Sequence, residues 1–244
     1  MTELSVNVNK LALLRNSRGH DAPNVVEFAK KFIDLGVKGI TIHPRQDERH
    51  ITRQDARDLG NLIRPLAGIE LNIEGYPSEE FLQLIEDVKP DQTTLVPDLP
   101  DQLTSDHGFD FHTQAEFLAP ILARLKKTGT RVSVFLDPDL EQVELAAKSQ
   151  ADRIELYTEE YAREFNSPKH AEVHQRYHDA AVLATKLGLE LNAGHDLNLD
   201  NLAKFVTIPG ILEVSIGHAL IIECLEYGMP YVARQYLAIC AASA

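Results

Sequence analysis

Short apolar runs alternate with longer amphipathic stretches along the whole chain. The apolar runs are rich in β-branched side chains, as buried strands are. We expect strands at residues 4–8, 39–42, 69–73, 92–96, 131–136, 153–157, 189–192 and 211–216. Between them, apolar positions recur at the helical spacing of three and four residues. The clearest such stretches are residues 24–35, 52–66, 77–89, 113–127, 138–148, 168–187, 198–205, the stretch opened by 217–218, and 230–242.

This order of elements predicts the fold class. Strands that alternate with helices form parallel βαβ units. Eight such units in 244 residues predict a closed (β/α)8 barrel, with residues 1–244 as one domain, because no linker or composition break divides the chain. The alternative is a doubly wound open sheet, but the chain has no GxGxxG or GxxxxGK motif to support a nucleotide site in such a sheet.

Polar side chains gather where the predicted strands end. In a barrel of this class the chemistry lies at the carboxyl ends of the strands. The residues at those ends are Asn7, Asn9, His43, Glu74, Asp98, Asp137, Glu155, His195 and His218. Imidazoles and carboxylates at one end of a barrel can donate and accept protons near neutral pH, so this set predicts general acid–base chemistry.

The densest of these ends follows the strand at 39–42. His43 stands where the strand stops, because Pro44 cannot continue a hydrogen-bonded ladder. Three basic side chains follow in the same loop: Arg45, Arg49 and His50. Thr52 then resembles the N-cap of a helix. An imidazole beside several cations suits proton transfer on a phosphorylated or carboxylated small molecule. The alternative is a solvated loop with one capping histidine.

Two glycine–histidine pairs follow the last two strands. Gly194-His195 and Gly217-His218 occupy the loops that often bind phosphate in barrels of this class. Glycine allows backbone N–H groups to approach an anion closely; the alternative is that both glycines only form tight turns.

Three other positions also have structural alternatives. Glu74 could be a solvated carboxylate, and Glu155 could pair with an arginine inside the barrel. The loop at 98–112 could be a lid that excludes water or an ordinary surface loop.

Composition narrows the classes of partner. The net charge is −13 and no lysine-rich block occurs, which argues against nucleic acid as a partner. No apolar run approaches the roughly 18–20 residues of a membrane span, and residues 1–10 lack the pattern of a signal peptide. Cys224 and Cys240 stand outside any CxxC motif, and HxH and HExxH are absent. We therefore expect a cytoplasmic protein without a metal.

Motifs along almost the whole chain resemble the pyridoxine 5′-phosphate synthase family. The stretches that carry the resemblance are Asn7, 15–19, 39–51, 95–97, 154–155, 191–195 and 216–219. The resemblance implies a barrel with additional helices, assembled as a homo-octamer. It implies condensation of 1-deoxy-D-xylulose 5-phosphate with 3-amino-2-oxopropyl phosphate, a ring-forming, transferase-type reaction that yields pyridoxine 5′-phosphate, phosphate and water without a cofactor.

The resemblance also implies roles for individual residues. His43 and Glu74 match proton acceptors, and His195 matches a proton donor. The residues expected to bind the phosphorylated substrates are Asn7, Asn9, Lys10, Arg18, Arg45, His50, Thr104, Glu155, Asp196, Gly217 and His218.

The chain departs from the family pattern at two places. Asn9-Lys10 replaces an aspartate–histidine pair, and Asp196 replaces a glycine beside a phosphate loop. A carboxylate there is unfavourable for phosphate unless it points away or meets a cation. We expect Lys10 to act as a fixed cation, or else to extend into solvent. The alternative functions are a diverged barrel that binds a phosphorylated metabolite without closing the ring, and a scaffold that binds a partner protein.

Overall fold

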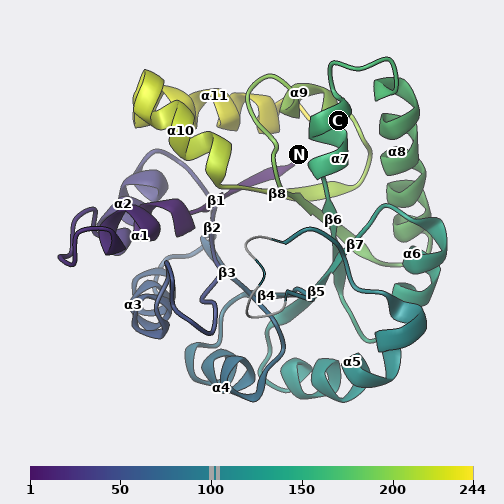
Figure 1. The fold of residues 1–244 in the computed structure, drawn as a ribbon, viewed down its shortest axis with the longest axis horizontal. Coiled ribbons are helices and arrows are strands. Elements are labelled where there is room, and N and C mark those ends of the chain that lie inside the picture. The colour runs from purple at the N-terminus through teal and green to yellow at the C-terminus, as the bar shows by residue number, and fades with distance from the viewer. Residues whose placement is uncertain (99–101, 103–104, 244) are drawn as a thin grey trace.

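The computed structural model describes residues 1–98, 102 and 105–243. Parallel strands form the centre, and helices surround them (Figure 1). The strands are β1 (Glu3–Asn7), β2 (Gly39–Ile42), β3 (Glu70–Gly75), β4 (Gln92–Leu95), β5 (Arg131–Leu136), β6 (Arg153–Tyr157), β7 (Glu190–Gly194) and β8 (Ile211–Ile216). The helices are α1 (Asn9–Asn16), α2 (Val25–Asp34), α3 (Arg53–Ile63), α4 (Glu79–Val88), α5 (Phe111–Lys126), α6 (Leu140–Ala147), α7 (Glu159–Glu164), α8 (His170–Lys186), α9 (Leu202–Phe205), α10 (His218–Tyr227) and α11 (Met229–Ala241).

The sheet closes on itself. Each strand pairs in parallel with the next, and β1 also pairs with β8. Ser5 is the register partner of both Gly39 on β2 and Ser215 on β8. The predicted (β/α)8 barrel is therefore confirmed, and the open-sheet alternative is wrong.

Local signals explain where several helices begin. Thr52 caps α3, as predicted: its hydroxyl accepts the backbone N–H of Asp55 at 3.1 Å, and the Asp55 carboxylate accepts the backbone N–H of Thr52 at 2.8 Å. The same carboxylate binds both terminal nitrogens of Arg15, at 2.6 and 2.8 Å. This bidentate ion pair joins the C-terminal part of α1 to the first turn of α3, and so fixes the chain that leaves β2.

The structure differs from the pattern in five segments. Strand β7 continues through Gly194, which therefore ends the strand instead of following it. The polar stretch after β1 contains α1, which begins where the Asn7 amide oxygen accepts the Asn9 backbone N–H at 3.0 Å. The acidic stretch after β6 contains α7. Strand β3 continues through Glu74, and the helix expected at 198–205 forms only over α9. Capping contacts and neighbouring strands, rather than periodicity, set these boundaries.

Apolar and polar positions separate on the two faces of the barrel wall. The strands' buried apolar side chains form a continuous core with the surrounding helices, including Val6, Ile40, Ile73, Val134 and Leu191. The interior instead carries hydrogen-bonded polar groups. Ser5 and Thr41 hydroxyl oxygens lie 2.6 Å apart, Asn72 donates to Thr41 at 3.4 Å, and Thr94 donates to Asn72 at 3.1 Å. Branched apolar residues usually fill this space.

Charged side chains close the end of the interior where the strands begin. Arg131 pairs with Glu70, and its Nε donates to Gln92 at 3.0 Å. Arg153 donates to Gln92 at 3.0 Å and to Glu190 at 2.6 Å, and lies 3.7 Å from Glu213. We call these residues, with Asn192 as a further acceptor of Arg153, the lower network. Among the described residues, no helix is long and apolar enough to cross a membrane.

Candidate active site

His43 and Glu74 meet at the carboxyl ends of β2 and β3. The His43 Nδ1 atom lies 4.0 Å from a Glu74 carboxylate oxygen, and both side chains are largely buried. The Asn7 amide donates to the same oxygen at 3.5 Å, and the Asn9 amide oxygen accepts the backbone N–H of His43 at 2.9 Å. The end of β1 thus orients both predicted proton acceptors.

Burial shifts the pKa of each group in the direction that favours its neutral form. Desolvation lowers the pKa of His43 well below its ordinary value, and the charges of Arg45 and His50 lower it further. Desolvation raises the pKa of Glu74 well above its ordinary value, and the charges of Glu155 and Asp98 add to this shift. The lowered pKa favours the neutral His43 imidazole, and the raised pKa makes the Glu74 carboxylate a stronger base than an exposed one.

Arg45 lies against the end of β4. Its guanidinium pairs with Asp98, and a second nitrogen donates to the Gln102 backbone carbonyl at 2.7 Å. The Ser105 hydroxyl donates to the same Asp98 oxygen at 2.7 Å, while the other oxygen, Oδ1, is buried without a hydrogen-bond partner within the described residues. Burial raises the pKa of Asp98, and Arg45 and the Ser105 hydroxyl oppose this rise.

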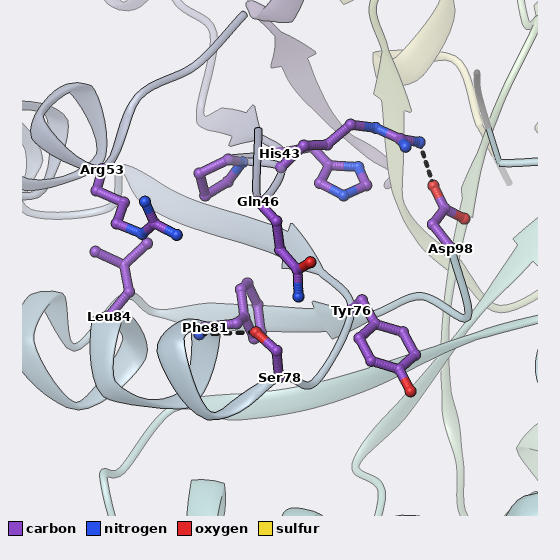
Figure 2. A pocket seen from close by; sticks show the side chains of 10 residues that line it. His43, Gln46, Arg53, Tyr76, Ser78, Phe81, Leu84 and Asp98 are labelled. Atoms are coloured by element: carbon purple, nitrogen blue, oxygen red, sulfur yellow. Dashed lines mark hydrogen bonds and ion pairs between the residues drawn. The ribbon is translucent and has the colours of Figure 1, made fainter. Parts of the chain in front are cut away.

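A pocket opens beside this ion pair. Figure 2 shows His43 and Gln46 on one side, with Tyr76, Ser78 and Phe81 on the other, and a dashed line marks the ion pair to Asp98. The loop after β2 supplies the first group, and the segment from β3 to α4 supplies the second.

Glu155 is a buried residue of β6. Burial raises its pKa to about 8, and the charge of Glu213 contributes. Its Oε2 atom has no hydrogen-bond partner among the described residues. A Cβ atom on Gly194 would lie 2.3 Å from its Oε1 atom, so this glycine makes room for the carboxylate. The predicted alternative, an ion pair between Glu155 and an arginine, is absent from the described salt bridges.

His195 follows β7 in an unusual backbone conformation. Its φ is +91° and that of Asp196 is +58°. The imidazole centroid lies 5.1 Å from the Tyr157 ring and 6.1 Å from the Phe135 ring. Sequence reasoning missed both aromatic residues, although Tyr157 follows Glu155 at the two-residue spacing of one strand face.

Asp196 turns its carboxylate toward cationic and imidazole groups. One of its oxygens lies 3.6 Å from His195 Nδ1. The neighbouring His195 imidazole lowers the pKa of Asp196, and His218 and Lys10 contribute through their charges. The negative charge of Asp196 is therefore partly compensated by these groups, which is the condition expected from the sequence for a carboxylate beside a phosphate loop.

The end of β8 and the start of α10 lie against β1. Gly217 precedes α10, whose N-terminus has no side-chain cap. A Cβ atom on Gly217 would lie 3.0 Å from the Asn7 Cβ. Neither Gly194 nor Gly217 has a positive φ. Close approach of neighbouring chain segments, rather than the conformation of a tight turn, is thus what favours glycine at these two positions.

His50 completes the basic loop. Its Nδ1 atom accepts the backbone N–H of Ile51 at 2.9 Å, so the neutral ring carries its proton on Nε2. Burial lowers the pKa of His50 to about 4, and the charges of Arg45 and Lys10 lower it further. A neutral Nε2–H remains available to a ligand at neutral pH.

Three other candidates lie apart from this group or outside the described residues. Arg18 is exposed on the segment between α1 and α2, which projects at the left edge of Figure 1. Asp137 accepts the backbone N–H of Gly108 at 3.1 Å and so anchors the preceding loop. Thr104, with residues 99–101 and 103 of the proposed lid, lies outside the described residues. No cluster of three or more His, Cys, Asp or Glu residues in the described part of the chain could hold a metal ion.

Comparison with known proteins identifies the family. The family described as "Pyridoxal phosphate biosynthesis protein PdxJ" matches residues 4–242. The chain belongs to the PdxJ family. It is 52% identical over 237 residues to the pyridoxine 5′-phosphate synthase of Bacteroides thetaiotaomicron, covering 97% of this chain and 98% of the relative. It is 51% identical over 238 residues to the synthase of Cytophaga hutchinsonii, with the same coverage.

Solved structures share the fold at low sequence identity. A mutant tryptophan synthase alpha-subunit from Pyrococcus furiosus has a TM-score of 0.63 at 13% identity, covering 98% of each chain. The N-(5′-phosphoribosyl)anthranilate isomerase of the same organism has a TM-score of 0.59 at 14% identity, covering 99% of each chain. These likenesses support the barrel fold alone.

Proposed function

We propose that this PdxJ-family chain is a pyridoxine 5′-phosphate synthase that condenses 1-deoxy-D-xylulose 5-phosphate with 3-amino-2-oxopropyl phosphate. The observation that carries the proposal is that His43, Glu74 and His195 lie at one end of the barrel, together with Glu155, whose Oε2 atom has no hydrogen-bond partner among the described residues. Identity of about half with named synthases over almost the whole chain supports the same reaction.

Two groups of donors suit the two phosphates. Arg45 and His50 form one group, in which the guanidinium and the Nε2–H can bind phosphate oxygens. Gly217 and His218 form the other, at the uncapped N-terminus of α10, where backbone N–H groups and the helix dipole favour an anion. Arg18 and Thr104 remain ligands proposed from the family resemblance.

The buried acids and imidazoles suit the proton transfers. Imine formation, loss of water and ring closure each move a proton between carbon, nitrogen and oxygen atoms. We assign His43 and Glu74 as acceptors because a neutral imidazole can take a proton, and a carboxylate is a stronger base when its pKa is raised. His195 donates a proton to the departing oxygen, and Glu155 faces positive charge that develops on the substrate.

The residues that depart from the family pattern, Asn9-Lys10 and Asp196, can each be given a role in the site. Asn9 holds the His43 backbone through its amide oxygen and does not need to titrate. Lys10, in the first turn of α1, supplies a fixed positive charge near His50 and Asp196. The backbone of Asp196 belongs to the phosphate loop, while its carboxylate turns toward His195.

A direct assay tests the proposal against the diverged-barrel alternative. The purified protein is incubated with both substrates, and pyridoxine 5′-phosphate and inorganic phosphate are measured. Stoichiometric formation of both is expected. Binding of either substrate by calorimetry without product would instead favour a barrel that has lost ring closure, and absence of both binding and product would favour a partner-binding scaffold.

An octameric assembly is expected from the family resemblance. Exposed apolar side chains on α10 and α11 support association: Ile222, Leu225, Tyr227 and Tyr231. Light scattering of the purified protein should give eight times the 27.3 kDa chain mass, and a monomer would contradict the assembly.

A further inference from the structure

The turn after β7 holds two consecutive non-glycine residues in the left-handed backbone region. These are His195, with φ +91°, and Asp196, with φ +58°. In that region the Cβ atom crowds the backbone, so non-glycine residues there are strained. Such strain persists only where surrounding contacts hold it in place. The turn therefore needs partners that stabilise its carbonyl groups.

Thr158, the residue after β6, supplies most of these contacts. Its backbone N–H donates to the Gly194 carbonyl at 3.0 Å. Its hydroxyl oxygen lies 2.7 Å from the same carbonyl and within hydrogen-bond distance of the His195 carbonyl. Asn201 adds a bond from its amide to the Asp196 carbonyl at 3.2 Å. The Gly194 carbonyl already accepts the Thr158 N–H, so the single hydroxyl hydrogen can serve the His195 carbonyl, and each carbonyl of residues 194–196 has a donor from outside the turn.

Strand β6 also positions the His195 side chain. Tyr157, directly before Thr158, places its ring edge-on to the imidazole at 5.1 Å. The turn's backbone and the imidazole ring are therefore fixed by adjacent residues of one strand end. If the backbone contact were lost, the imidazole would move relative to Glu74 and His43. Displacements of about 1 Å from productive geometry can slow catalysis roughly 100-fold.

We propose that Thr158 is a positioning residue for His195, whose hydroxyl holds the strained turn so that the imidazole faces the reacting atoms. This inference rests on the proposed role of His195 as proton donor. Thr158 is itself fully buried, so it acts through His195 and not on the substrate.

Two substitutions at Thr158 distinguish the contribution of its hydroxyl group from that of its side-chain shape. Thr158→Val keeps the branched shape and removes the hydrogen-bond donor, and it should lower kcat by about 10–100-fold with KM changed less than threefold. Thr158→Ser keeps the hydroxyl and should stay within about threefold of the wild-type kcat. Wild-type kcat in Thr158→Val would overturn the proposal, as would equal losses in both variants.

A matched control comes from another buried threonine. The Thr93 hydroxyl oxygen lies 3.2 Å from that of Thr130 and, among the described residues, makes no hydrogen bond to the 194–196 turn. Thr93→Val makes the same chemical change in the barrel wall, so it should alter Tm while leaving kcat unchanged. A loss of kcat in Thr93→Val equal to that in Thr158→Val would mean that the effect is general destabilisation, and would overturn the proposal.

Relief of the strain provides a second, independent comparison. Glycine adopts the left-handed conformation without crowding, so Asp196→Gly should make the turn less dependent on Thr158. The fold-loss in kcat caused by Thr158→Val should be at least about threefold smaller in the Asp196→Gly background than in the wild type. Equal fold-losses in the two backgrounds would contradict the strain argument.

Crystal structures of Thr158→Val and Thr158→Ser test the inference without turnover. We expect the 194–196 turn to leave the left-handed region, or to shift, in the valine variant only. Retained positive φ at both positions and an unmoved imidazole would overturn the proposal. Absence of product from the wild-type protein would instead contradict the proposed function. In that case the two crystal structures, without any kinetic data, would still show whether Thr158 holds the turn.

Discussion

The buried carboxylates at the two ends of the barrel interior differ in how completely their oxygens are paired. In the lower network, Arg131 and Arg153 pair with carboxylates, and Gln92 bridges them. At the opposite end, Glu155 and Asp98 each keep a buried oxygen without a hydrogen-bond partner among the described residues. Buried polar groups are almost always paired. In the lower network Asn192 Nδ2 also lacks a partner among the described residues, but each carboxylate there lies beside an arginine. The opposite end, which we call the ligand end, is where we propose that the substrates bind.

The pKa of one carboxylate from each end shows the same contrast. Burial raises the pKa of both, to about 7 for Glu213 in the lower network and to about 8 for Glu155. Arg153 opposes the shift at Glu213, whereas no cation contributes at Glu155. Nearby positive charge keeps the pKa of the first acid closer to its ordinary value, and the second acid lacks such a charge.

The largest expected effect is at the ligand end. His195→Asn removes the proposed donor and should lower turnover by about 10²–10⁴-fold, because a positioned acid contributes that much to rate. Steady-state kinetics with both substrates measure this, and the Tm should stay near that of the wild type. Turnover retained in a folded variant would mean that the donor role is wrong.

Arg45→Ala is the contrasting variant, because Arg45 is proposed to bind phosphate. It should mainly raise KM for one phosphorylated substrate. A pure effect on kcat would contradict its assignment as a ligand.

In the lower network the expected effect is on stability. Arg153→Met removes the guanidinium beside Glu213, while Gln92 keeps its hydrogen bond from Arg131, and breaking such a buried ion pair costs about 3–5 kcal/mol. Chemical denaturation at pH 8 should show this loss. At pH 5 the loss should be smaller, because Glu213, with its raised pKa, is then protonated. A large fall in kcat without a loss of stability would contradict the proposal that the lower network stabilises the fold while the opposite end carries out the reaction.

The pH dependence of stability sharpens the same comparison. The pKa of Glu155 is about 8 in the folded chain, above its unfolded value of about 4.3, so the folded state binds this proton more tightly. Its contribution favours folding at low pH and is lost as the pH rises between these values. Glu155→Gln removes that dependence, so its Tm relative to the wild type should rise between pH 5 and pH 8.

Glu79→Gln is the control for this pH experiment. Glu79 is on the surface, and hydrogen bonds from Arg124 lower its pKa. Its relative Tm should therefore change little between pH 5 and pH 8. A parallel change in both variants would show that the effect does not come from the buried carboxylate.

The smallest expected effect is at Lys10. Lys10→Met should raise KM for one phosphorylated substrate a few-fold, and the difference should shrink at high salt, because exposed charges are screened. Unchanged kinetics would mean that the ammonium extends into solvent.

Restoring the family pair with Asn9→Asp and Lys10→His should leave turnover within a few-fold, since Asn9 already holds the His43 backbone. A large gain would identify this chain as a weakened family member.

Local features of the chain were enough to predict the barrel and the end at which its polar residues gather. Strand and helix periods are local properties, and parallel strands bring all their carboxyl ends to one side. His43, Glu74 and His195 could therefore be assigned to one site although they lie far apart in the chain. Glycine–histidine pairs after the last two strands were visible in the same way.

Which of these groups are paired could not be predicted from local patterns and became clear from the folded barrel. The partners of Arg45 are Asp98 and the Gln102 carbonyl, more than fifty positions away, and no local pattern connects them. The space that Gly194 leaves for Glu155, and the hold of Thr158 on the turn of His195, likewise join separate strands. Pairing, burial and backbone strain depend on distances between remote segments, and those distances exist only once the barrel has closed.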